Sequence, residues 1–275
     1  MSVSLNNKKI PVVDFHVHTF PDKIAEKAVS KLAVISGITP YTNGTIKNTK
    51  EKFQNEKIDF FINLNIATSP SQETSINTNV IKLNKENKNI VSFGSVHFLS
   101  ENAVKWLEKL KENGVKGIKL HPDYQGFMID DQRLYPIYEK CSELGLIVVF
   151  HTGWDCYSPN LIHAPAKLSL KIHKMFPKLK MVLAHFGGLM RWNETEEYLI
   201  GQNIYLDTAM CASYMDKSQM ERMILKHDSN KILLASDCPW ENPKKSLDFI
   251  LSLNIKDEIK EKIIYKNAFN FLNLI

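Results

Sequence analysis

The sequence predicts an α/β fold in which eight parallel strands, each followed by a helix, close into a (β/α)8 (TIM) barrel that forms one domain over residues 1–275. Short β-branched apolar runs alternate with longer amphipathic runs, and 275 residues lie within the usual size of such a barrel. A doubly wound sheet is the alternative, but no glycine-rich phosphate fingerprint follows the first strand. These observations favour the barrel.

Eight runs have the length and composition of buried strands. They are residues 10–17, 58–66, 90–95, 115–120, 146–150, 181–184, 204–206 and 232–235. Helical patterns lie between them, and several open on a proline that suits a first helical turn, among them Pro21, Pro165 and Pro243. An extra C-terminal helix is predicted over residues 256–272, outside the barrel. The polar, turn-rich segment at about residues 38–57 is predicted to be an insertion that acts as a lid.

Composition and charge exclude several classes of protein. The net charge of +5 comes mostly from lysines that lie beside glutamates, which is typical of a solvated helix face and not of a nucleic-acid-binding surface. The longest nearly apolar run, LGLIVVF, is far shorter than the roughly 20 residues that cross a bilayer, so no membrane association is expected. Four single cysteines indicate neither a disulfide framework nor a zinc ribbon, and a cytoplasmic protein is expected. The expected partner is a small-molecule substrate, and a homodimer stays an open alternative.

Polar residues occupy one face of the first predicted strand. In the stretch VVDFHVHT, Asp14, His16 and His18 alternate with other residues, so all three point to the same side. Such a face makes a poor core, so it either meets polar groups or binds a metal. Reactive groups of a parallel barrel gather at the carboxyl ends of its strands, so the residues that end later strands are candidates to join these three. They are His97, Lys119, His121, His151, His185, Asp207 and Asp237.

Taken together, these strand ends predict a metal site. An HxH pair alone is a modest signal, but it becomes strong when single histidines end two later strands and an aspartate ends the last. Imidazole nitrogens and a carboxylate are the ligands of a catalytic zinc or a related divalent ion that keeps a position open for water.

The ordered motifs DFHVHT, GIKLHP, FHTG, KMVLAHFGG, YLDTAM and ASDCPW resemble those of the amidohydrolase superfamily of metal-dependent (β/α)8 barrels. The resemblance covers essentially the whole chain and is to the amidohydrolase-related branch, which includes aminocarboxymuconate-semialdehyde decarboxylase and related hydrolases and hydratases. Carried over by position, it implies that His16, His18, His151 and Asp237 bind one divalent ion, with zinc favoured. For His185 it implies either a second metal or, as favoured here, an acid/base role beside the reactive water.

Lys119 and His121 keep two interpretations each. In two-metal members of the superfamily a carboxylated lysine bridges the ions, and Lys119 stands at that place; as an unmodified cation it would instead bind a substrate carboxylate. His121 either contacts the substrate or bonds a neighbouring loop. Asp14 is expected to orient a ligand histidine or a substrate group, or to accept backbone amides, and Asp207 is either a pocket residue or a helix N-cap.

The resemblance favours metal-dependent hydrolysis of a small amide, ester or lactone. The ion would lower the pKa of water from about 15.7 towards about 7, Asp237 would accept the proton, and His185 would align the water. The alternative is a decarboxylase or hydratase of a small carboxylated unsaturated or aromatic acid, whose carboxylate Lys119 would hold together with Arg133 or Arg191. A nuclease or phosphoesterase would need an acidic ligand where Lys119 stands.

Overall fold

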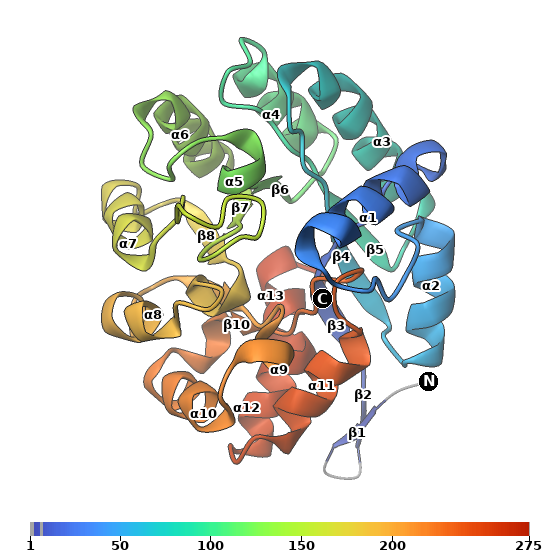
Figure 1. Ribbon diagram of the computed structural model, residues 1–275, viewed down its shortest axis with the longest axis vertical. Coiled ribbons are helices and arrows are strands. Elements are labelled where there is room, and N and C mark those ends of the chain that lie inside the picture. The colour runs from blue at the N-terminus through green and yellow to red at the C-terminus, as the bar shows by residue number, and fades with distance from the viewer. Residues whose placement is uncertain (1–2, 6–7, 275) are drawn as a thin grey trace. The chain divides into compact units, whose positions relative to one another are not determined.

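The computed structural model describes residues 3–5 and 8–274, which divide into two compact units. The first unit combines the chain up to Asn63 with the chain from Ile200 onward, and the second unit is Leu64–Leu199. Each unit is built from strands followed by helices, drawn in chain order from blue to red in Figure 1.

The first unit holds the N-terminal and C-terminal strands. A short antiparallel pair, β1 and β2, precedes the parallel pair β3 and β4, and β9 pairs in parallel with β10. The bounds are Val3–Leu5 for β1, Lys8–Ile10 for β2, Val13–Val17 for β3, Phe60–Leu64 for β4, Tyr205–Asp207 for β9 and Ile232–Leu233 for β10.

The end of β3 lies beside the segment that follows β10. The Phe15 amide donates to the Leu234 carbonyl at 2.8 Å, and the Asp237 amide donates to the His16 carbonyl at 2.9 Å. All five residues of β3 are buried, and its register with β4 shifts between Asp14 and Val17. The carboxyl ends of two chain segments more than 200 residues apart therefore meet within one unit.

The helices of the first unit follow its strands. They are α1 (Asp22–Ser36), α2 (Ile46–Asn55), α9 (Cys211–Tyr214), α10 (Lys217–Lys226), α11 (Pro243–Ser252), α12 (Asp257–Glu261) and α13 (Asn267–Leu272). A π-helical turn, Lys262–Lys266, joins α12 to α13, and the carbonyl of Ile263 within it accepts the Leu234 amide at 2.9 Å. The predicted C-terminal helix is thus confirmed, with a π turn where one carbonyl bonds outside the helix.

Two expectations for the N-terminal region differ from the structure in detail. The first predicted strand, 10–17, is interrupted at Pro11, which cannot donate a ladder hydrogen bond, and the strand resumes at Val13. The predicted lid segment contains helix α2, whose first turn is capped by the Thr45 hydroxyl accepting the Asn48 amide at 3.2 Å. Its function as a lid stays a prediction.

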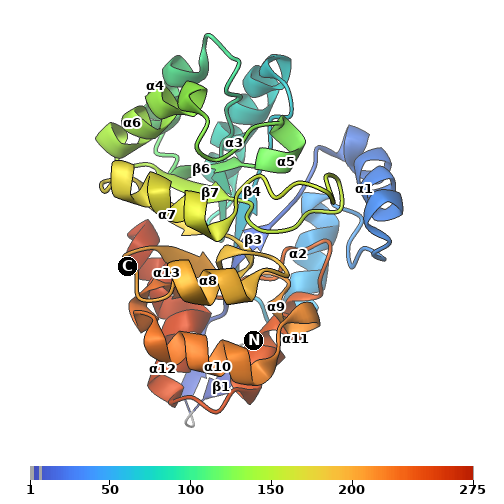
Figure 2. The same cartoon turned by 60° about the vertical axis from the view of Figure 1, so that its left-hand side comes forward.

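The second unit contains four parallel strands and their helices. β6, β7 and β8 pair in parallel, and Gly94, just after β5, bridges to Ile118 in β6. The strands are β5 (Ile90–Phe93), β6 (Gly117–Leu120), β7 (Ile147–Phe150) and β8 (Lys180–Leu183). The helices are α3 (Glu73–Glu86), α4 (Ala103–Glu112), α5 (Pro122–Gln125), α6 (Tyr135–Leu144), α7 (Ala166–Met175) and α8 (Trp192–Tyr198). Helices α4 and α6 lie side by side (Figure 2).

Candidate metal centre

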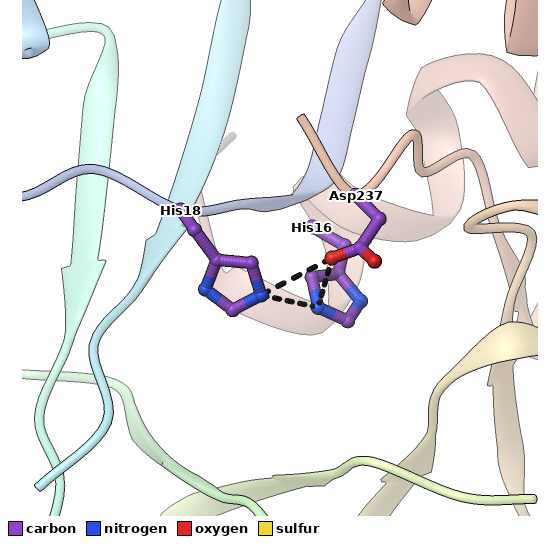
Figure 3. Close-up of side chains that lie close together, drawn as sticks. All are labelled: His16, His18 and Asp237. Carbon is purple, nitrogen blue, oxygen red and sulfur yellow. Dashed lines mark hydrogen bonds and ion pairs between the residues drawn. The ribbon is translucent and has the colours of Figure 1, made fainter. Parts of the chain in front are cut away.

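Three predicted ligands meet in the first unit. His16 in β3, His18 just after it and Asp237 after β10 point toward one another (Figure 3). Nε2 of His16 lies 3.1 Å from Nε2 of His18 and 3.2 Å from Oδ1 of Asp237, and Nε2 of His18 lies 3.1 Å from the same oxygen. Donor atoms bound to one ion at about 2.1 Å lie roughly 3.0 Å apart in an octahedron and roughly 3.4 Å apart in a tetrahedron. The triangle of donors therefore fits a single divalent ion.

The other ring nitrogen of His16 contacts Asp207. Nδ1 of His16 lies 2.9 Å from Oδ2 of Asp207, at the end of β9, and both side chains are buried. Asp207 does not cap the next helix, because α9 begins at Cys211 and Met210 precedes it without a side-chain cap. Of the two interpretations of Asp207, the structure places it at the site.

Asp14 ties the two ligand-bearing segments together. Its carboxylate accepts the His16 amide at 3.1 Å, the Ser236 amide at 3.0 Å and the Ser236 hydroxyl at 2.5 Å. Burial raises the pKa of Asp14 to about 7, and the charge of Asp207 adds to this rise. The hydrogen bonds from Ser236 and His16 lower the same pKa and so offset part of the rise. Asp14 contacts His16 through the backbone amide, which matches the interpretation that it accepts backbone amides. Its role in orienting a ligand histidine stays a prediction.

The backbone at Asp237 adopts an unusual conformation. Its φ of 71° lies in the left-handed region, which is uncommon for residues other than glycine. The amide of Asp237 is held by the His16 carbonyl, and the Cys238 carbonyl accepts the His18 amide at 2.6 Å. These bonds hold Asp237 in a conformation that turns its carboxylate toward the two histidines.

The second unit brings together His151 and His185. Nε2 of His185 lies 2.9 Å from Nδ1 of His151, and both residues are buried. His185 has a φ of 58° in a short 3-10 turn, and its carbonyl accepts the Trp192 indole N–H at 2.9 Å. Whether His151 completes the ligand set of His16, and whether His185 is an acid/base, stay predictions.

A second group of potential ligands surrounds His151. Nε2 of His151 lies 3.4 Å, and Nε2 of His121 lies 3.7 Å, from Oδ2 of Asp155. The rings of His121 and His151 stack with centroids 4.2 Å apart and planes 10° apart, and the Nδ1 of His121 accepts the Tyr124 amide at 3.4 Å. A nitrogen lone pair lies in its ring plane, so two stacked rings cannot both direct lone pairs at one ion. The second group therefore fits an ion less well than the first.

Neighbouring polar residues fasten the loop after β7. Asp123 in α5 accepts the Ser158 hydroxyl, and its Oδ1 lies 2.9 Å from Nδ1 of His163. Burial raises the pKa of Asp123, while Ser158 and then His163 lower it. Reasoning from the sequence missed Ser158 and His163, because neither lies at a strand end. It also missed the supporting role of Ser236, which stands at the end of the last strand but whose hydroxyl is not a typical metal ligand.

The cations predicted to hold a substrate carboxylate lie in different environments. Lys119 in β6 is fully buried. Arg133 is exposed and pairs with Asp131, and Arg191 is half exposed and pairs with Glu194. Lys119 is therefore the better candidate of the three, and its role stays a prediction.

Comparisons with known proteins show the family of the chain. The model of a family described as Amidohydrolase matches residues 83–274. A 2-amino-3-carboxymuconate-6-semialdehyde decarboxylase of Dictyostelium discoideum is 29% identical over an alignment of 133 residues, and the match covers 41% of this chain and 37% of that relative. The chain thus spans little more than a third of the length of that relative.

Solved structures show the fold. An uncharacterised TIM-barrel protein of Bordetella bronchiseptica has a TM-score of 0.75 and 16% identity, with 96% of this chain and 99% of that chain covered. A dihydroxybenzoic acid decarboxylase of Polaromonas, solved with manganese and the inhibitor 2-nitroresorcinol, has a TM-score of 0.71 and 16% identity over 96% and 97% of the two chains. The predicted (β/α)8 barrel is confirmed.

The expectations about membranes, domain number and partners are tested only in part. No helix described within residues 3–5 and 8–274 is long and apolar enough to cross a membrane. The predicted single domain, the small-molecule partner and the homodimer stay predictions.

Proposed function

Because the chain belongs to the amidohydrolase family, we propose that it is a metal-dependent decarboxylase of a small carboxylic acid. The observation that carries the proposal is the donor triangle of His16, His18 and Asp237, whose sides of 3.1 to 3.2 Å suit one divalent ion. Two proteins similar to the chain are named as decarboxylases. The Dictyostelium protein is similar in sequence, and the Polaromonas protein is similar in structure. They support the decarboxylase alternative better than the hydrolase that the motifs favoured.

The metal would be held by His16, His18 and Asp237, with His151 as the further ligand that the resemblance implies. A bound divalent ion supplies a Lewis acid that withdraws electron density from a coordinated carboxylate or hydroxyl group of the substrate. Manganese is proposed beside zinc, because the Polaromonas decarboxylase was solved with manganese.

The reaction breaks the bond between a substrate carbon and its carboxylate. Carbon dioxide leaves, the electron pair stays on the carbon, and a proton must be added there. We assign this proton to Oδ2 of Asp237, since Oδ1 faces the two histidine nitrogens. Lys119 would bind and orient a negatively charged substrate group, and His185 would stabilise the charge that develops.

The test measures carbon dioxide release by the full-length protein loaded with Mn²⁺ or Zn²⁺. Hydroxylated and amino-substituted benzoates and muconate-like acids form one panel, and amides, esters and lactones form the other. We expect release from at least one acid, loss of metal in His16→Ala, and loss of turnover with metal retained in Asp237→Asn. Hydrolysis of a compound in the second panel, with no carbon dioxide from the first, would restore the hydrolase.

A further inference from the structure

We propose that Asp207 is a positioning residue that keeps His16 in the one neutral tautomer able to bind a metal ion. The inference deepens the proposed function, because it concerns the same site and rests on the metal proposed there. Asp207 contacts the donor triangle at Nδ1 of His16, so its effect on the metal site is exerted through this ring.

The carboxylate of Asp207 is itself fixed in place. Its Oδ1 accepts the Ala209 amide at 3.1 Å, while its Oδ2 lies 2.9 Å from Nδ1 of His16. The backbone at Asp207 pairs in parallel with Leu233 of β10, and the next amide, of Thr208, donates to the Leu233 carbonyl at 3.0 Å. With side chains 1% and 0% exposed, the His16–Asp207 pair is shielded from water that could replace either partner.

This contact decides which nitrogen of His16 carries the proton. An ionised carboxylate only accepts hydrogen bonds, so Nδ1 of His16 must be the donor, and a neutral ring then has a lone pair on Nε2. That lone pair points into the triangle with His18 and Asp237. In the opposite tautomer Nε2 would carry a hydrogen and could not bind an ion. A carboxylate behind a ligand histidine also raises the basicity of the ligand nitrogen.

Asp14 provides a contrast on the same histidine. It accepts the backbone amide of His16, which is present in both ring tautomers. Asp14 therefore influences where β3 lies, and Asp207 influences the ring itself.

The first experiment measures Mn²⁺ affinity of the metal-free full-length protein by calorimetry at pH 8. Asp207→Leu removes the acceptor, and Asp207→Asn keeps an oxygen that can accept without its charge. We expect binding about 10- to 100-fold weaker in Asp207→Leu and a smaller loss in Asp207→Asn. The matched control is Asp59→Asn, since Asp59 accepts the Val12 amide at 2.9 Å just before β3, and this variant should bind within about twofold of wild type.

The second experiment reads the tautomer without metal or activity. In protein labelled with ¹⁵N-histidine, the His16 ring signals are identified by their absence in His16→Ala. Wild type should show a proton on Nδ1 of His16, and Asp207→Leu should show a substantial share of rings that carry their proton on Nε2 alone. If Asp207→Leu does not fold, Asp207→Asn is compared in its place.

The outcomes separate the two proposals. Unchanged Mn²⁺ affinity in a folded Asp207 variant, or an unchanged tautomer, overturns the role of Asp207 while the metal site stands. If wild type binds no divalent ion, the proposed function fails, and with it the use of Asp207 for metal binding.

Discussion

The histidines of this chain differ in what their two ring nitrogens contact. His16 directs Nδ1 at a carboxylate and Nε2 into the donor triangle, so one nitrogen is available for a ligand. His227 uses both nitrogens within the protein: Nδ1 accepts the Gly201 amide at 3.2 Å, and Nε2 donates to the Ile204 carbonyl at 2.9 Å. A buried ring with both nitrogens engaged is a structural histidine, which the sequence pattern alone could not distinguish from a ligand.

His227 provides a prediction about pH. Burial lowers its pKa below the ordinary 6.5, and protonation would also remove the acceptor of the Gly201 amide. The neutral His227 ring therefore contributes fully to the stability of the fold above about pH 6.5, and this contribution is lost as the pH falls below that value. Urea unfolding between pH 5 and pH 8 should show a steeper loss of stability for wild type than for His227→Gln, whose amide can also accept and donate. Parallel curves would contradict this role.

At the scale of elements, the strand ends are what the sequence predicts best. His16, His18 and Asp237 could be found because strands have a local period of two and the ends of parallel strands meet. Asp207 could not be assigned, because a pocket residue and an N-cap look alike until the start of the next helix is known, and α9 begins only at Cys211.

Loops were less predictable than strands. The contacts of Asp123 with Ser158 and His163 join residues 35 and 40 positions apart through a segment with no regular period. The interruption of the first strand at Pro11 has a local cause, since proline lacks an amide hydrogen. Strands and helices can thus be predicted from the regular spacing of their apolar residues, whereas side-chain contacts across loops depend on the folded backbone.

Gly117 permits the close pairing of β6 and β7, and this pairing positions Lys119 within β6. A Cβ at Gly117 would lie within 3.0 Å of the Ile147 carbonyl oxygen and of the Phe93 ring, and a backbone oxygen cannot move aside. We expect Gly117→Ala to lower the free energy of unfolding by roughly 2 to 3 kcal/mol. At Gly37, nothing lies within 4 Å and only the φ of 70° is unfavourable, so Gly37→Ala should cost about 1 kcal/mol. Denaturant unfolding of both variants checks the order, and equal losses would refute the close contact.

At the scale of the whole molecule, a bound ion would link parts of the chain that are far apart in sequence. Within the first unit, β3 and the segment after β10 supply all three members of the donor triangle. Without metal, two histidines and a carboxylate lie 3.1 to 3.2 Å apart and are mostly buried, which is costly unless protons or an ion compensate. Metal binding should therefore contribute directly to the stability of the fold.

Adding Mn²⁺ to about 100 times its Kd should stabilise the protein by about 2.7 kcal/mol if the ion binds only the folded state. For a chain of this size we expect the melting temperature to rise by roughly 5 to 10 °C. EDTA should reverse the rise, and His16→Ala, which removes one corner of the triangle, should show almost none of it.

Hydrogen exchange measured on the same samples locates the effect. Amides of 13–17 and 234–238 should gain protection, and those of β7 should gain it as well if His151 is a ligand. A gain confined to the first unit would contradict the assignment of His151 and leave His16, His18 and Asp237 as the ligands from this chain.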